Sequence, residues 1–199
     1  GGLNLDRVYR QDVKVPHWER GAKESVTMIH AAGAEPLNAL ALGGSVPSPA
    51  GGVLAEVIEV KSLDEVITLG HAKIAGKIVF FNRPLDPTVI RPGLAYSGAG
   101  DQRSRGPSLA GKYGAVGALT RSLTHARDDF PHTGGTTYAA NTPKIPAAAL
   151  STIAADKLSA ALAASQRGEV GTVRVSLKIN SRWLPAAPSH NVIGEISGT

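Results

Sequence analysis

The sequence contains no cysteine, few aromatic residues and no long hydrophobic run. Because cysteine is absent from all 199 residues, a disulfide framework and a thiolate metal site are both excluded. Aromatic residues amount to 5%, and neither a basic helix nor an aromatic platform motif is present, so no nucleic-acid partner is predicted. No segment approaches the roughly 18 consecutive apolar residues that a membrane span requires, so no membrane partner is predicted either.

Catalytic sequence patterns are missing too. None of the six histidines lies in an H-E-x-x-H motif, and neither a G-x-S-x-G nucleophile elbow nor a P-loop occurs. The stretch YSGAGDQRSRG departs from the dinucleotide fingerprint, because Arg103 stands at the third glycine. The stretch RDDFPH gathers Asp128, Asp129 and His132, which we interpret as a solvated loop rather than a metal site. We predict no catalytic residue, metal ligand or bound cofactor in this chain.

The composition is typical of a globular domain with many short elements. Hydrophobic residues make up 42% and charged residues 19%, and the chain contains 23 glycines and 13 prolines. The net charge is +5, and the stretch from Arg83 to Arg127 is rich in Lys and Arg, opposed there only by Asp86 and Asp101. We interpret this stretch as a mildly basic face. Long-range attraction of anionic substrate ends is the alternative.

Hydrophobic periodicity predicts a mixed α/β fold built mainly on β-sheet and flanked by a few short helices. The predicted strands are residues 8–15 (ended by Pro16), 24–30, 53–60, 76–82, 115–122, 145–151, 172–179 and 189–199. The predicted helices run from the Ser62 cap to Gly70, over residues 107–114, and from the Thr152 cap to residue 168. Residues 83–106 are predicted to form a long loop. Near-continuous apolar runs place segments 53–60, 77–81, 115–119 and 145–150 in the core, with helix 152–167 packed on them.

The stretch FNRPLDPT follows one of these buried strands and carries Arg83 and Asp86 between two prolines. Rigid loops at the end of a strand often face ligands, so this loop is a candidate binding element. An Arg83–Asp86 ion pair that fixes the turn is the alternative interpretation.

Several segments, in order along the chain, resemble one known family. They are VPHWERGAKES, LALGGSVPSPAGGVLAEVIEV, GKIVFFNRPLDPT, DQR, KYGAVGALTRS, DDFPHTG, KIPAAALS and SHNVIGEISGT. Together they resemble the protease-associated (PA) domain that is inserted into the catalytic domain of carboxypeptidase Q-like dinuclear zinc peptidases. The resemblance implies a PA-type sandwich or open barrel over residues 19–188. Residues 1–18 and 189–199 would then be strands that leave and re-enter the catalytic domain, and the chain would end upstream of the first zinc-binding His and Asp.

This resemblance implies a function without catalysis by this chain. The parent protein would be a secreted or periplasmic exopeptidase acting on dipeptides or short peptides, with two zinc ions in its catalytic domain. This chain would cover the active-site cleft and restrict or orient the substrate, so its partners would be its own catalytic domain and a peptide. The candidate residues facing the cleft are Arg83, Asp86, Asp101, Gln102, Arg103 and His132.

Two other functions remain open at this point. One is a freestanding module that binds an anion or a peptide, with Arg83 and Arg103 holding the anion. The other is an interaction domain that makes the parent a homodimer. Because an inserted domain leaves and re-enters its host at neighbouring points, we also expect the two end segments of the chain to pair. Val8, Val13 and Val15 would supply one strand, and Val192 and Ile196 the other.

Overall fold

The computed structural model describes residues 4–198, which contain ten strands and four helices. They divide into two compact units. One unit comprises the two end segments, up to Glu19 and from Trp183 on, and the other is Arg20–Arg182. The predicted end segments 1–18 and 189–199 include residues 1–3 and 199, which lie outside the described residues. Within residues 4–198, no helix is both long enough and apolar enough to cross a membrane.

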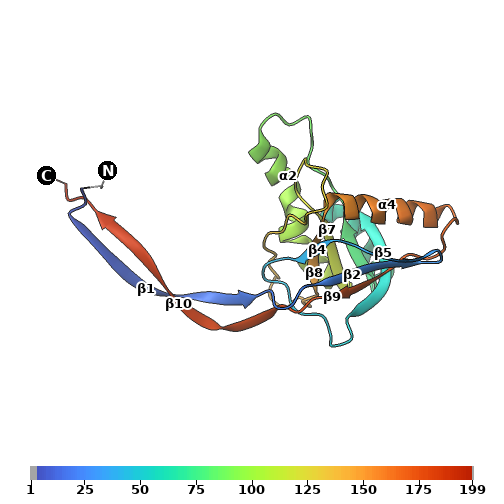
Figure 1. Ribbon diagram of the computed structural model, residues 1–199, viewed down its shortest axis with the longest axis horizontal. Helices are drawn as coiled ribbons and strands as arrows, with labels where there is room; N and C mark the ends of the chain where they lie inside the picture. Colours follow the sequence, from blue (N-terminus) through green and yellow to red (C-terminus); the bar gives the residue numbers. More distant parts are fainter. Residues whose placement is uncertain (1–3, 199) are drawn as a thin grey trace. The chain divides into compact units, whose positions relative to one another are not determined.

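The end segments form a two-stranded sheet of β1 (Arg7–Glu19) and β10 (Arg182–Glu195), drawn in Figure 1 as a twisted ribbon. The amide of Asp6 donates to the carbonyl of Glu195 at 2.9 Å, so the expected pairing of the two end segments is confirmed. The predicted bounds 189–199 are wrong, because β10 begins earlier, at Arg182, and ends at Glu195, before Ile196. The prediction that Pro16 ends the first strand is wrong. Both strands of a two-stranded sheet are edge strands, and an edge strand accommodates proline where its nitrogen faces outward.

The unit Arg20–Arg182 contains an eight-stranded sheet with the order β3-β2-β9-β5-β6-β7-β8-β4. Its strands are β2 (Ser25–His30), β3 (Gly33–Pro36), β4 (Ala39–Ala41), β5 (Val53–Val60), β6 (Ile78–Phe81), β7 (Gly117–Arg121), β8 (Ala147–Leu150) and β9 (Arg174–Lys178). Strands β5, β6, β7 and β8 are parallel, and the remaining neighbours pair antiparallel.

This sheet is strongly curled. Strands β3 and β4 stand at opposite ends of the strand order, yet only Leu37 and Asn38 separate them in the sequence. A two-residue connection cannot span a flat eight-stranded sheet, because neighbouring strands lie about 4.8 Å apart. The two edges must therefore approach each other, which makes the sheet an open half-barrel. The predicted mixed α/β fold with an open barrel and few helices is confirmed. The short strands β3 and β4 were not predicted.

The core lies on both faces of β6, the sequence IVFF, in which every residue is buried. Val79 and Phe81 belong to a buried cluster that includes residues of α1 (Leu63–Ile74) and α3 (Gly106–Lys112). Helix α4 (Thr152–Gln166) packs on β5, β7 and β8 and contributes buried Leu158. The predicted core is confirmed for β6, β7 and β8, because strands buried on both faces have near-continuous apolar sequences. Strand β5 contributes Ala55, Val57 and Val60 to the core, but its other face is only partly covered and Leu54 is exposed.

Two predicted helix limits are wrong by a few residues. Helix α1 begins at the predicted Ser62 cap, whose hydroxyl accepts the Glu65 amide at 3.1 Å, but it continues past Gly70 to Ile74. Gly70 has φ +60° and forms a kink, because glycine can adopt this conformation without ending the element. Helix α4 is capped by Ser151 rather than by Thr152, and the Ser151 hydroxyl accepts the amide of Ala154 at 2.9 Å.

The predicted loop 83–106 contains a helix instead, α2 (Pro92–Ser104). Three glycines and the lack of a capping side chain hide it in the sequence. The helix is stabilised by tertiary packing, because Ala95, Ala99 and Gln102 form one buried stripe. It continues almost directly into α3, and the Leu109 amide donates to the Arg105 carbonyl at 3.0 Å across the junction. Pro107 lies in the first turn of α3, as predicted, where no amide hydrogen is needed.

Candidate functional site

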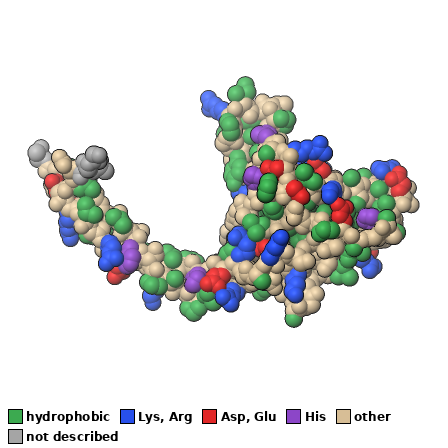
Figure 2. Space-filling view, viewed as in Figure 1, with side chains coloured by type: hydrophobic (Ala, Val, Ile, Leu, Met, Phe, Trp, Pro, Cys, Tyr) green, Lys and Arg blue, Asp and Glu red, His purple; other side chains and the backbone are tan. Residues whose placement is uncertain are grey.

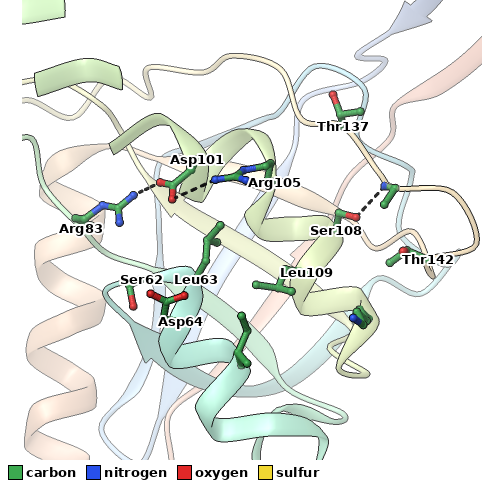
Figure 3. A pocket seen from close by; sticks show the side chains of 13 residues that line it. Ser62, Leu63, Asp64, Arg83, Asp101, Arg105, Ser108, Leu109, Thr137 and Thr142 are labelled. Carbon is green, nitrogen blue, oxygen red and sulfur yellow. Dashed lines mark hydrogen bonds and ion pairs between the residues drawn. The ribbon is translucent and has the colours of Figure 1, made fainter. Parts of the chain in front are cut away.

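A groove of about 700 Å³ lies between α1, the α2–α3 segment and the loop 137–142 (Figure 3). We call it the α1–α3 groove. All its lining residues belong to the unit Arg20–Arg182. They are Ser62, Leu63, Asp64, Ile67, Arg83, Asp101, Arg105, Ser108, Leu109, Lys112, Thr137, Ala139 and Thr142.

One wall of the groove is formed by side chains that recur with helical periodicity along the α2–α3 segment. Asp101, Arg105, Ser108, Leu109 and Lys112 follow each other at spacings of four, three, one and three residues. These spacings are helical, and the Arg105 amide donates to the Asp101 carbonyl at 2.9 Å while the Leu109 amide donates to the Arg105 carbonyl at 3.0 Å across the α2–α3 junction. The five side chains therefore line one wall of the groove although they come from two helices. The pattern is visible in the sequence, but the prediction of a loop over residues 83–106 concealed it.

The floor of the groove is apolar. Leu63 on α1 and Leu109 on α3 are partly buried and pack against the core cluster. Ile67, one turn after Leu63, lines the groove with about half of its surface exposed (51%). Exposed apolar surface that is backed by the core forms a fixed contact area, because the residues beneath it cannot move apart.

The loop 137–142 forms the second wall and is tied to α3. The amide of Ala139 donates to Ser108 Oγ at 2.9 Å, and the amide of Thr137 donates to the Ser104 carbonyl at 2.9 Å. A Cβ on Gly111 would lie 2.3 Å from the carbonyl oxygen of Pro143, so the chain directly after this loop approaches α3 closely enough to require glycine there. These contacts give the groove a defined width.

A cluster of three charges closes one end of the groove, and we call it the Asp101 cluster. The guanidinium of Arg83 binds one carboxylate oxygen of Asp101, and the guanidinium of Arg105 lies 3.8 Å from the other. Figure 3 shows the two arginines approaching Asp101 from opposite sides. The Gln102 amide also donates to Asp101 Oδ1 at 2.8 Å. Two guanidinium groups therefore share one carboxylate.

Gln102 positions Arg83 in this cluster. Its side chain is fully buried and pairs with both backbone groups of Arg83. The side-chain oxygen accepts the Arg83 amide at 3.0 Å, and the side-chain nitrogen donates to the Arg83 carbonyl at 2.7 Å. Gln102 thus acts as a backbone partner for the segment after β6 and makes no contact with the groove.

The remaining predicted residues, Asp86, Arg103 and His132, do not line the groove. Asp86 accepts the amide and the hydroxyl of Thr88 at 2.9 and 2.6 Å, and these hydrogen bonds hold the pKa of Asp86 below its usual value. The alternative of an Arg83–Asp86 pair is therefore wrong, because Arg83 binds Asp101 and Asp86 forms its own turn.

Arg103 and His132 are held at two other places. The Arg103 guanidinium lies 5.1 Å from the ring centre of Tyr96 and donates to its hydroxyl. His132 Nε2 lies 3.4 Å from Asp128 Oδ2. Of the six predicted residues, the structure brings together Arg83, Asp101 and Gln102.

The stretch RDDFPH is engaged in structural contacts. Asp129 accepts the Ser151 hydroxyl at 2.5 Å and the side-chain amide of Asn38 at 2.6 Å, so it reinforces the cap of α4. Asp128 faces His132 instead. Over the described residues 4–198, no group of three His, Asp or Glu side chains is arranged to hold a metal ion.

A polar network that the sequence did not suggest lies where the parallel strands end. Glu59 on β5 accepts from Asn82 at 2.7 Å and from Ser159 of α4 at 2.9 Å. Arg121 at the end of β7 donates to Asp156 of α4 at 2.6 Å. Burial works to raise the pKa of Glu59, but hydrogen bonds from Lys61, Asn82 and Ser159 lower it below the usual value. The sequence did contain a signal for this network, because polar residues stand at the ends of neighbouring apolar strands. The carboxyl ends of parallel strands meet at one edge of the sheet, so these residues were bound to lie close together.

The buried hydroxyl of Tyr138, in the loop 137–142, should make the stability of the fold depend on pH in the alkaline range. Its hydroxyl donates to the Ile145 carbonyl at 2.5 Å, and burial raises the pKa of Tyr138 from 10.0 to about 12. The fold therefore favours the protonated hydroxyl. This stabilisation is complete below pH 10 and is lost as the pH rises through 12. As the pH rises over this range, the free energy of unfolding should fall by on the order of 2 kcal/mol more in wild type than in Tyr138→Phe.

Urea unfolding of the two proteins at several pH values between 9 and 12 measures this difference. The gap in free energy of unfolding should narrow steadily from the lower to the upper pH. Two curves that stay parallel would mean that Tyr138 ionises as easily in the folded state as in the unfolded state.

Comparison with known proteins gives one consistent result. No family model matches the chain. Carboxypeptidase Q of Xenopus laevis is 36% identical over 196 residues, which are 98% of this chain and 38% of that protein. The crystal structure of a peptidase M28 precursor from Shewanella amazonensis superposes with a TM-score of 0.86 at 33% identity, over 98% of this chain and 42% of that one.

An aminopeptidase from Aneurinibacillus sp. shares the fold alone, with a TM-score of 0.63 at 18% identity over 94% of this chain and 38% of that one. The chain is thus homologous to a segment of carboxypeptidase Q, and it spans about 38% of the length of the Xenopus protein.

Proposed function

We propose that this chain is the PA domain, with flanking strands, of a zinc-dependent exopeptidase that hydrolyses dipeptides or short peptides. In this proposal residues 19–188 form the PA domain, and the segments before and after it belong to the catalytic domain. The PA domain covers the active-site cleft and restricts which substrates enter. The catalytic domain, which is not in this chain, holds two zinc ions, and the whole protein is secreted or periplasmic.

One observation carries this proposal. The homology to carboxypeptidase Q covers 98% of this chain but only 38% of the relative, as expected for one part of a larger peptidase. The separation of the unit Arg20–Arg182 from the paired end segments also supports an inserted domain. In such an arrangement the two connections lie side by side, and the side-chain amide of Asn180 donates to the Ala22 carbonyl at 3.3 Å.

Two carboxylates of this chain, Asp101 and Glu59, support a role outside the chemical step. Asp101 is neutralised by two arginines, and Glu59 accepts hydrogen bonds from three side chains. A general acid or base needs a pKa near the working pH, whereas hydrogen bonds lower the pKa of Glu59 and keep it ionised. These groups fix the positions of strands and helices.

The test compares the full-length protein with a variant in which Arg20–Arg182 is replaced by a short Gly-Ser linker. The linker can be short because Ala22 and Asn180 are hydrogen-bonded. If the domain restricts access, the variant should keep its activity on a dipeptide. Its kcat/KM on peptides of about ten residues should rise at least about tenfold relative to the dipeptide, which corresponds to about 1.4 kcal/mol.

The 199-residue chain alone, supplied with zinc, provides the companion measurement. It should release no product from a panel of dipeptides above a zinc-only blank, while the full-length protein serves as the positive control. Turnover that copurifies with the isolated chain would refute the non-catalytic role. An unchanged ratio of long-peptide to dipeptide activity in the linker variant would refute the role in substrate access.

A further inference from the structure

The Asp101 cluster carries an excess of positive charge at the edge of the α1–α3 groove. Asp101 is the acceptor for both Arg83 and Arg105, and among residues 4–198 no other ion pair of Arg105 is found. The Arg83 side chain is 28% exposed, whereas the Arg105 side chain is 72% exposed. Arg105 also makes the longer of the two contacts with Asp101, at 3.8 Å. Arg105 can therefore turn toward a second carboxylate without breaking the closer Arg83–Asp101 contact.

An apolar surface of defined shape adjoins this charge. Leu109 lies one helical turn after Arg105 on the same face, and Leu63 and Ile67 face it from α1. Figure 3 shows Leu63 and Leu109 beside the Asp101 cluster. The groove volume of about 700 Å³ falls within the roughly 300–1,000 Å³ of small-molecule sites. A ligand that fills the groove would cover this apolar surface and at the same time neutralise the excess positive charge of the Asp101 cluster.

We propose that the α1–α3 groove binds an aliphatic carboxylate, namely the C-terminal residue of a peptide with a branched apolar side chain. The carboxylate pairs with Arg105, and the side chain lies on Leu63, Ile67 and Leu109. This assignment does not rest on the proposed function, because it concerns a site wholly within the unit Arg20–Arg182. Guanidinium groups pair with carboxylates through two parallel hydrogen bonds, which fixes the orientation of the ligand.

The other charged groups of the groove restrict the ligand further. Lys112 occupies the last turn of α3, where its charge offsets the partial negative charge of the helix end. Asp64 lies in the first turn of α1 on the opposite wall and repels a second acidic group. A monocarboxylate with an apolar body therefore suits the groove, whereas inorganic phosphate offers no apolar surface to Leu63, Ile67 and Leu109.

The probes are N-acetyl-leucine, its uncharged amide N-acetyl-leucinamide, and inorganic phosphate, each titrated into the ¹⁵N-labelled 199-residue chain and followed by NMR. N-acetyl-leucine should shift the amide signals of α1 and α3 and of the loop 137–142, with a dissociation constant on the order of 1–10 mM for so small a ligand. N-acetyl-leucinamide should bind at least about tenfold more weakly, because the charge-assisted hydrogen bonds are lost. Phosphate should leave the signals of Leu63, Ile67 and Leu109 unchanged.

Two variants and one matched control complete the experiment. Arg105→Gln should bring the affinity for N-acetyl-leucine down to that for the amide, and Ile67→Asp should weaken both ligands. Arg91→Gln removes the same charge from the exposed cap of α2, outside the groove, and should bind like wild type. All three positions are exposed, so the fold should be retained.

Several results would overturn the assignment. They are the absence of saturable shifts, equal affinity for the acid and the amide, shifts confined to another surface, and equal losses in Arg105→Gln and Arg91→Gln. A groove that responds to phosphate as strongly as to N-acetyl-leucine would also overturn it, since charge alone would then account for binding. None of these results bears on the test of substrate access with the linker variant, so the two proposals fail separately.

Discussion

Phe80→Ala should lower the free energy of unfolding by about 3–5 kcal/mol, the largest effect that we expect from a single substitution in this chain. Phe80 is fully buried in β6, between β5 and β7 of the parallel part of the sheet. Removing its ring loses the transfer free energy of the side chain and leaves a cavity that a strand with neighbours on both sides cannot collapse to fill. Val79→Ala removes fewer atoms and should cost less.

Equilibrium unfolding in urea measures this effect, with Ile90→Ala as the matched control. Ile90 is 95% exposed, so its truncation should change the free energy of unfolding by less than about 0.5 kcal/mol. Similar midpoints for Phe80→Ala and wild type would place the centre of the core in a different strand.

Gln102→Leu should lower the free energy of unfolding by about 2–3 kcal/mol, because it leaves two backbone groups without partners. In the wild type the Gln102 side chain pairs with both the amide and the carbonyl of Arg83. Leucine fits the volume but makes neither hydrogen bond. The loss should also release the segment after β6, which carries Arg83 into the Asp101 cluster.

The matched control is Gln166→Leu, the same substitution at an exposed position near the end of α4. It should leave the unfolding midpoint close to that of wild type. Equal effects of the two substitutions would show that the loss comes from replacing glutamine in a helix and not from the pairing with Arg83. Hydrogen exchange adds a local readout, since the Arg83 amide should exchange faster only in Gln102→Leu.

Where local patterning decided the structure, the sequence was sufficient. The apolar run of β6 and the alternation of β9 predicted these strands, because a strand with both faces buried and a strand with one wet face have different periodicities. The hydroxyl of Ser62 predicted the start of α1, since a cap needs only a hydroxyl and an amide three residues on. The pairing of the end segments and the family resemblance also came from residues read in order.

Tertiary contacts decided the rest. Helix α2 has weak local signals and exists because Ala95, Ala99 and Gln102 are buried against neighbouring elements. Arg83 pairs with Asp101 rather than with Asp86, which is nearer in the sequence, because α2 brings Asp101 to the end of β6.

The α1–α3 groove was likewise beyond prediction from single segments. Its walls come from α1, from the α2–α3 segment and from the loop 137–142, which are far apart in the sequence. Local sequence specifies which face of a helix is polar or apolar, but the distance between two faces depends on the packing of everything beneath them. For this protein the sequence by itself determined the longer strands, most of the core and the charges available to a site. Only the packed structure decided that Arg105, Leu109 and Ile67 share one groove.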